Sequence, residues 1–157
     1  MFVVKELLGH PLFKEGVHWK GVTFKKDEKI VSLGDTSKDL YWLKKGAARV
    51  LGSVDVGDSR RIQPGVCDIK VGDVFGELAL FDQQPRSATV ISLEETEVVI
   101  IDGDELMLFL ENNSDIGFGF MCDMMDTMVK RLRASNEKVF SLFAWGLKAH
   151  KIDEHLP

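Results

Sequence analysis

The sequence contains little cysteine and no long apolar run, and each absence excludes a class of protein. Cys67 and Cys122 are the only cysteines among 157 residues, so they provide no disulfide framework and indicate a reducing compartment. No stretch approaches the roughly 18 apolar residues of a membrane-spanning helix. The first ten residues also lack the basic and apolar segments of a secretory signal. We therefore expect a soluble, cytoplasmic protein without a membrane partner.

The chain lacks the basic surface that nucleic-acid binding needs and the central histidines that a metal-dependent enzyme needs. The chain has 20 Lys and Arg against 25 Asp and Glu, a net charge of −5, so it offers no basic face for the phosphates of a nucleic acid. Its four histidines, at positions 10, 18, 150 and 155, lie near the termini. A metal-dependent enzyme on a β-barrel needs histidines and a carboxylate inside the barrel. No nucleophile triad or G-x-x-x-x-G-K-[ST] loop occurs either. We expect no catalytic residues, no metal, no cofactor and no nucleic-acid partner.

Short apolar runs separated by turn residues occupy the middle of the chain. This spacing is typical of an antiparallel β-roll or jelly-roll barrel, here over about residues 20–102. Residues 53–64 lack a clear apolar alternation, so a strand there is uncertain. We expect a single domain over residues 1–157, mainly β with C-terminal helices. The expected strands are 22–24, 30–33, 40–43, 47–54, 66–69, 88–93 and 98–101.

The remaining segments have helical patterns. A short helix is expected at residues 2–9, another at 104–112, and a long one at 115–143, begun by the cap pair Ser114-Asp115. The long helix carries one apolar seam, spaced alternately by four and three residues, which predicts a homodimer through the helix 114–143. Alternatively, the helix packs alone on the barrel, or folds over its own pocket with Phe140, Phe143 or Trp145 as a lid. The seam consists of Met121, Met125, Met128, Leu132, Ser135, Val139 and Leu142.

The most informative segment is Gly72–Val90, which reads G-D-V-F-G-E-L-A-L-F-D-Q-Q-P-R-S-A-T-V. The tetrapeptide at 76–79 opens a short helix, and Arg86 follows nine residues after Glu77. A helix N-terminus together with one guanidinium suits a singly charged phosphate, and Gly76 lets the backbone approach it closely. The alternative is a surface ion pair between Glu77 and Arg86 at a β-turn, with Leu78 and Leu80 in the core.

This run resembles the phosphate-binding cassette of cyclic-nucleotide-binding domains, where F-G-E-(hydrophobic)-A-L and P-R-x-A-T bracket the ligand. The resemblance covers about residues 10–143 and extends to Leu33-Gly34-Asp35 and the strand 40–46. It implies that Arg86 holds the cyclic phosphate and Glu77 accepts from the ribose 2′-OH. The backbone N–H groups of Leu78 and Ala79 would share the phosphate. Gly76, Ser87 and Ala88 complete the implied cassette.

Residues 128–139 are similar to the dimer helix of catabolite-activator-type regulators. In those proteins two neighbouring polar residues meet the purine base, one of them from the opposite subunit, and here they would be Ser135 and Asn136. These two residues favour the amino group of adenine and therefore cyclic AMP as the ligand. Cyclic GMP is the second candidate, because the Ser87 hydroxyl could bond either the phosphate or a guanine amino group. The alternative for Ser135 is a bond to a carbonyl one turn earlier.

The resemblance implies a regulatory sensor whose output lies in an unidentified downstream protein, since no winged-helix DNA-binding domain follows Leu142 in this sequence. The alternative is a degenerate fold that acts as a protein-interaction or dimerisation module without nucleotide. Gly117 and Gly119 interrupt good helix-forming sequence. They are expected either to act as a hinge between the short helix and the long one or to be close-packing positions against the barrel.

Overall fold

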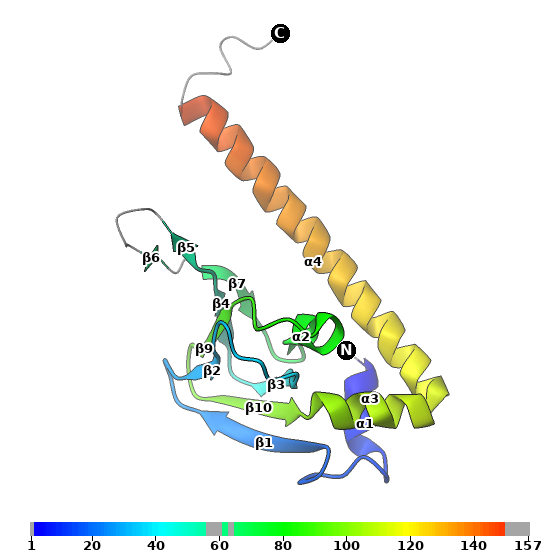
Figure 1. Cartoon of the computed structure of the whole chain (residues 1–157). Helices are drawn as coiled ribbons and strands as arrows, with labels where there is room; N and C mark the ends of the chain where they lie inside the picture. The colour runs from blue at the N-terminus through cyan, green and yellow to red at the C-terminus, as the bar shows by residue number, and fades with distance from the viewer. Residues whose placement is uncertain (1, 56–60, 63–64, 150–157) are drawn as a thin grey trace. The chain divides into compact units, whose positions relative to one another are not determined.

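The structure is a computed structural model that describes residues 2–55, 61–62 and 65–149 (Figure 1). The chain divides into two compact units, Met1–Gly117 and Phe118–Pro157. In chain order the elements are α1 (Phe2–Gly9), β1 (Trp19–Phe24), β2 (Lys29–Val31), β3 (Leu40–Lys45), β4 (Ala48–Leu51), β5 (Val54–Asp55), β6 (Arg61–Ile62), β7 (Gly65–Ile69), β8 (Val74–Phe75), α2 (Glu77–Asp82), β9 (Thr89–Ser92), β10 (Thr96–Ile101), α3 (Gly103–Asn112) and α4 (Ser114–Ala149).

The strands of the first unit form two four-stranded antiparallel sheets, with orders β1-β10-β3-β8 and β2-β9-β4-β7. Strands β5 and β6 pair as a separate hairpin. The antiparallel β-roll with C-terminal helices is therefore confirmed. The expected strand at 47–54 is split, because Gly52 and Ser53 separate β4 from β5. Strands β6 and β8 were not predicted, since two residues are too few for an apolar alternation. Residues 56–60 and 63–64, in the segment without a clear apolar alternation, lie outside the described residues.

The core of the β-roll lies between the two sheets. On β3, Tyr41 and Leu43 belong to it, and the Tyr41 ring stacks on Phe75 of β8 with 5.1 Å between centroids. Leu40 and Trp42 alternate with them on the same strand and are also buried. Both faces of β3 are therefore covered, which explains why all of residues 40–43 are apolar or aromatic. The interior cluster comprises Ile30, Val31, Tyr41, Leu43, Ala48, Ile69, Phe75, Val90 and Val98.

Helices α1 and α3 supply a second apolar layer of the first unit. Phe13, just after α1, packs edge-on against Phe109 of α3 with 4.9 Å between ring centroids. Helix α3 begins as its sequence predicts, because the Asp102 side chain accepts a hydrogen bond from the Glu105 N–H at 3.0 Å. Helix α1 has the predicted bounds. Both helices therefore match the expected positions to within one residue.

Helix α4 runs from Ser114 to Ala149, six residues beyond its predicted end. It passes through Gly117 and Gly119 without a break. A Cβ at Gly117 would lie 2.8 Å from the Leu110 carbonyl oxygen, so this glycine lets α4 begin in close contact with α3. The packing interpretation therefore explains Gly117, although the contact is with α3 rather than with the barrel.

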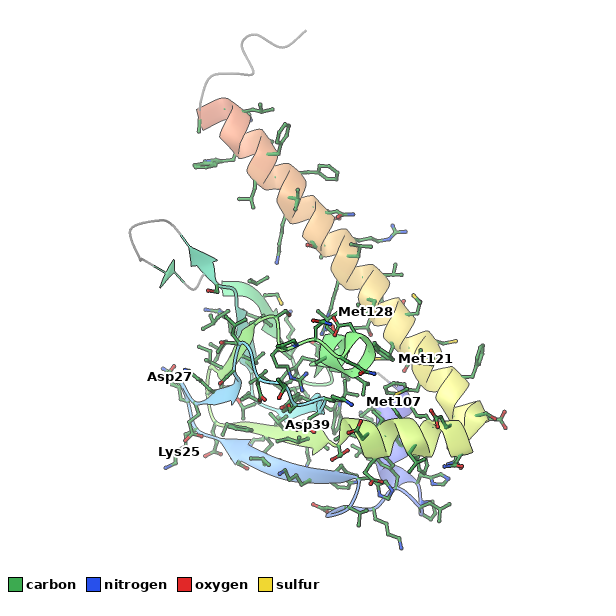
Figure 2. All side chains as sticks on the ribbon, in the orientation of Figure 1. Lys25, Asp27, Asp39, Met107, Met121 and Met128 are labelled. Carbon is green, nitrogen blue, oxygen red and sulfur yellow. The ribbon has the colours of Figure 1, made fainter. Side chains whose placement is uncertain are left out.

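The apolar seam of α4 is largely exposed on the single chain. Met125 and Leu132 are 64% and 63% exposed, and Val139 and Leu142 are similar. Figure 2 labels two further members of the seam, Met121 and Met128. Within the described residues, none of the helices combines the length and apolar character needed to cross a membrane.

Candidate functional site

The cassette begins with a tight turn at Gly76, directly before α2. The residue has φ of 85°, in the left-handed region that glycine adopts without strain. A Cβ there would lie 2.7 Å from Arg86 Nη1 and 2.9 Å from Tyr41 Cδ2. The sequence suggested that this glycine admits the phosphate. The structure adds that it also admits the guanidinium and the tyrosine ring.

Arg86 is the central side chain of the site. It is only 4% exposed, and its guanidinium donates to protein oxygens on two sides. Nη1 donates to the Gly76 carbonyl at 2.7 Å, and Nη2 donates to Ser37 Oγ at 3.1 Å and to the Asp39 carbonyl at 2.6 Å. Its Cζ lies 5.2 Å from the centroid of the Tyr41 ring, a cation–π distance. The guanidinium is therefore held in place by two main-chain carbonyls, one hydroxyl and an aromatic ring.

One nitrogen of this guanidinium makes no hydrogen bond. In the part of the chain that the structure describes, Arg86 Nε is buried and has no hydrogen-bond acceptor. Buried polar groups are usually paired, so an orphaned donor on a buried cation needs an explanation. An anion bound at this position would provide the acceptor, and the residues present therefore fit a phosphate ligand.

Helix α2 starts with Glu77, which is 5% exposed. Because Glu77 and Arg86 are both buried, the alternative of a surface ion pair at a β-turn is wrong. Ala79 is buried and Leu78 is half-exposed, so of the two leucines that alternative placed in the core only Leu80 lies there. The first N–H groups of a helix lack partners within it. Gly76 provides no side-chain cap for them.

After Arg86 the chain continues through Ser87, which is exposed, and Ala88, which is half-buried, into β9. The cassette is fastened here to residues 33–35. The Arg86 N–H donates to the Asp35 carbonyl at 2.7 Å, and the Gly34 N–H donates to the Arg86 carbonyl at 2.9 Å. These backbone bonds explain why Leu33-Gly34-Asp35 accompanies the cassette as a sequence signature.

Two titratable groups beside Arg86 have shifted pKa values. Burial raises the pKa of Asp39 above its usual value of 3.8, and the charge of Asp102 adds to this, whereas Arg86 and Lys20 act in the opposite direction. Burial likewise raises the pKa of Tyr41, against the effect of a hydrogen bond with Ser37. The pKa of Asp39, labelled in Figure 2, is therefore raised even though the charge of Arg86 acts to lower it.

The sequence did not predict Ser37, Asp39 and Tyr41 as part of the site. Ser37 and Asp39 meet Arg86 through a hydroxyl and a main-chain carbonyl, and a carbonyl has no residue-type signature. Tyr41 belongs to the strand signature at residues 40–46, and this signature was the one sequence feature that could have indicated its place in the site. The predicted base contacts Ser135 and Asn136 are exposed on α4 and belong to the second compact unit. Their contact with a base stays a prediction. Within the described residues, no cluster of three or more metal-ligating side chains occurs.

Known proteins match this chain over the same region. A family model described as the cyclic nucleotide-binding domain matches residues 21–113. A cGMP-dependent protein kinase of Toxoplasma gondii is 36% identical over 121 residues, which cover 76% of this chain and 10% of the kinase. The cAMP-activated global transcriptional regulator Vfr of Pseudomonas aeruginosa is 32% identical over 117 residues, 72% of this chain and 51% of that protein. The chain thus spans about half or less of the length of these relatives.

Solved structures share the fold. The catabolite activator protein of Thermus thermophilus superposes with a TM-score of 0.67 at 18% identity, over 89% of this chain and 58% of that one. A cyclic nucleotide-binding domain of Methylobacillus flagellatus gives a TM-score of 0.69 at 20% identity, over 78% of this chain and 67% of that one. With the family model matching more than half of its residues, the chain belongs to the cyclic nucleotide-binding domain family.

Proposed function

We propose that this protein is a regulatory sensor that binds a 3′,5′-cyclic nucleotide at the cassette Gly76–Ala88. The observation that carries the proposal is the buried Arg86, whose Nε has no acceptor among the described residues. The cyclic phosphate takes that donor and the N–H groups of Leu78 and Ala79 at the start of α2. Glu77, at the same end of α2, accepts from the ribose 2′-OH.

Cyclic AMP is the preferred ligand in this proposal, with cyclic GMP as the second candidate. Ser135 and Asn136 are exposed polar residues on α4 and are free to meet the amino group of adenine. Ser87 is exposed directly after Arg86, where its hydroxyl reaches either the phosphate or a guanine amino group. Relatives of both kinds support a cyclic nucleotide without choosing between the two bases.

The proposed assembly is a homodimer through residues 114–143 of α4. The exposed Met125, Leu132 and Val139 form part of one apolar stripe, and a second copy of the helix would remove it from water. The competing arrangement uses the exposed Phe140, Phe143 or Trp145 as a lid over the base. The oligomeric state in solution separates these arrangements.

The output is proposed to be regulatory rather than catalytic and to pass from the C-terminal helices to an unidentified downstream protein. Neither a nucleic acid nor a membrane is a proposed partner, and the proposed location is the cytoplasm. Relatives include the cAMP-dependent protein kinase regulatory subunit of Colletotrichum trifolii, 41% identical over 76 residues, which cover 44% of this chain and 18% of that protein. This relative supports a sensor that acts through another polypeptide.

Isothermal titration with cyclic AMP, cyclic GMP and linear 5′-AMP tests the proposal. We expect saturable binding of the cyclic nucleotides, tighter for cyclic AMP, and much weaker binding of 5′-AMP, whose phosphate carries a second charge and lacks the ring. Tighter binding of cyclic GMP would refute the assignment of the base contacts. No binding of any cyclic nucleotide would instead support the degenerate interaction module.

A further inference from the structure

Residues 34–39, which connect β2 to β3 and are called the strap below, hold the guanidinium of Arg86 from one side. The strap supplies three acceptors to Arg86: the Ser37 hydroxyl and the Asp39 carbonyl accept from its guanidinium, and the Asp35 carbonyl accepts from its main-chain N–H. Its conformation is fixed internally by the Ser37 N–H, which donates to Asp35 Oδ1 at 3.1 Å. The strap is thus attached to the phosphate site by the same side chain that is proposed to bind the ligand.

The strap also contacts the start of α3. Lys38 Nζ forms an ion pair with Asp104 Oδ1 at 3.0 Å. A Cβ on Gly103 would lie 2.3 Å from the Lys38 carbonyl oxygen and 3.0 Å from Leu80 Cδ1 of α2. Gly103 is therefore the point at which the strap, the cassette helix α2 and the first turn of α3 come together without room for a side chain.

The donor geometry of Arg86 makes this arrangement sensitive to the ligand. A guanidinium presents two planar forks for bidentate binding, Nε with Nη2 and Nη1 with Nη2. Both forks include Nη2, and Nη2 donates to Ser37 Oγ and the Asp39 carbonyl of the strap. Bidentate capture of a phosphate therefore takes a hydrogen bond away from the strap.

We infer that nucleotide binding releases Ser37 and Asp39 of the strap from the Arg86 guanidinium and thereby loosens the contacts of the strap with Gly103 and Asp104 at the N-terminus of α3. This inference rests on the proposed function of Arg86. In this inference Lys38 and Gly103 couple the phosphate site to α3. No sequence pattern indicated such a role for either residue. Because coupling between two sites is reciprocal, loosening the strap from α3 should also strengthen nucleotide binding.

Hydrogen exchange of the full chain with and without cyclic AMP tests the first half of the inference. The readouts in α3 are the N–H groups of Glu105 and Leu106, which donate to the Asp102 side chain and carbonyl. We expect protection to rise in residues 76–86 and to fall in residues 103–106. A general stabilisation by ligand would raise protection in both segments, so unchanged or increased protection at 103–106 in the bound state overturns the inference.

Charge variants test the second half by titration with cyclic AMP. Lys38→Gln and Asp104→Asn each break the same ion pair, and each is expected to tighten binding, by up to about fivefold for an exposed pair. The double variant should gain no more than either single one. Glu105→Gln removes the same charge one residue along from Asp104, at a side chain that forms no ion pair within the described residues. It should leave affinity within about twofold, as expected of an isolated surface change.

Lys38→Gln separates the coupling from simple electrostatics. Removing a positive charge near an anion site weakens binding by Coulomb's law, whereas the coupling predicts tighter binding. Weaker binding by Lys38→Gln, or equal effects of Asp104→Asn and Glu105→Gln, would overturn the inference and leave the proposed function standing. If the wild-type chain binds no cyclic nucleotide, the proposed function fails first and the inference fails with it.

Discussion

The cassette and the long helix α4 depart from the usual distribution of side chains in opposite ways. In the cassette, the charged residues Glu77 and Arg86 are buried; along α4, the apolar residues Leu132 and Val139 are exposed. A buried charge and an exposed apolar stripe are the two informative exceptions to ordinary burial. The first indicates a polar ligand, and the second indicates an apolar partner. The two regions therefore need different molecules to complete them.

The largest effect is expected from charge placed in the seam. Replacing Met128→Glu and Leu132→Glu together removes two apolar side chains from the proposed interface, each worth about 1.5–3 kcal/mol when buried. The dimer dissociation constant should therefore rise by at least about a hundredfold, as measured by sedimentation. Ala134→Glu puts the same charge on an exposed position away from the seam and should leave the dimer unchanged. A wild-type protein that already sediments as a monomer would contradict the dimer and favour the lid.

The next effect belongs to the buried charge. Arg86→Ala removes a charge-assisted hydrogen bond of about 1.5–3 kcal/mol. The affinity for cyclic AMP, measured by titration, should therefore fall by about one to two orders of magnitude. Arg49→Ala is the matched control, because Arg49 is a more exposed arginine of the same β-roll, paired with Asp68 at 2.6 Å. Thermal unfolding must show both variants folded. If Arg86→Ala bound cyclic AMP as tightly as wild type, the buried guanidinium would not be the phosphate-binding group, and the contrast between the two regions would be lost.

The sequence could predict the cassette because the chemistry there depends on residue type. Glu77 and Arg86 are charged residues at a fixed spacing, and Gly76 occupies a position where φ is positive. It could not predict the contacts of Arg86 with the Asp39 and Gly76 carbonyls, because every residue has a carbonyl. The contact of Gly103 with the strap was missed for the same reason.

For the fold, the sequence failed to predict very short strands and the end of a helix that continues past a glycine. The long strands β3 and β10 carry an apolar pattern that can be read directly, whereas β8 has only two residues. Helix α4 was predicted to end at 143 but continues through Gly146 to Ala149. A glycine within a helix costs only about 1 kcal/mol, so it weakens a helix without ending it.

A smaller effect should follow from adding one methyl group at the cassette turn. Gly76→Ala places a Cβ 2.7 Å from Arg86 Nη1, at a residue with positive φ. Gly72→Ala has the same kind of backbone, with φ of 93°, and no atom within 4 Å of the added Cβ. Both should lose about 1–2 kcal/mol of stability from the left-handed backbone. Only Gly76→Ala should also weaken nucleotide binding. Equal binding by the two variants would show that the cassette tolerates displacement of Arg86.

The smallest effect concerns the carboxylate that lies beside the buried guanidinium. Burial and the nearby Asp102 raise the pKa of Asp39 above 3.8 in the folded protein, despite Arg86 and Lys20. A folded-state pKa above the unfolded value means that ionising Asp39 costs stability as pH rises from about 3.8 through the raised pKa. Asp39→Asn keeps the carbonyl that accepts from Arg86 and removes this cost. It should therefore be more stable than wild type at neutral pH and equal to it below the unfolded pKa.

Asp68→Asn supplies the comparison of opposite sign in the same urea-unfolding series over pH. The hydrogen bond from Arg49 lowers the pKa of Asp68, so its contribution to stability is present above 3.8 and is lost as pH falls through the lowered pKa. Asp68→Asn should accordingly be slightly less stable than wild type at neutral pH, the reverse of Asp39→Asn. Destabilisation by both substitutions at neutral pH would mean that the charge of Asp39 helps to hold Arg86. The carboxylate would then be part of the phosphate site rather than a cost of burying it.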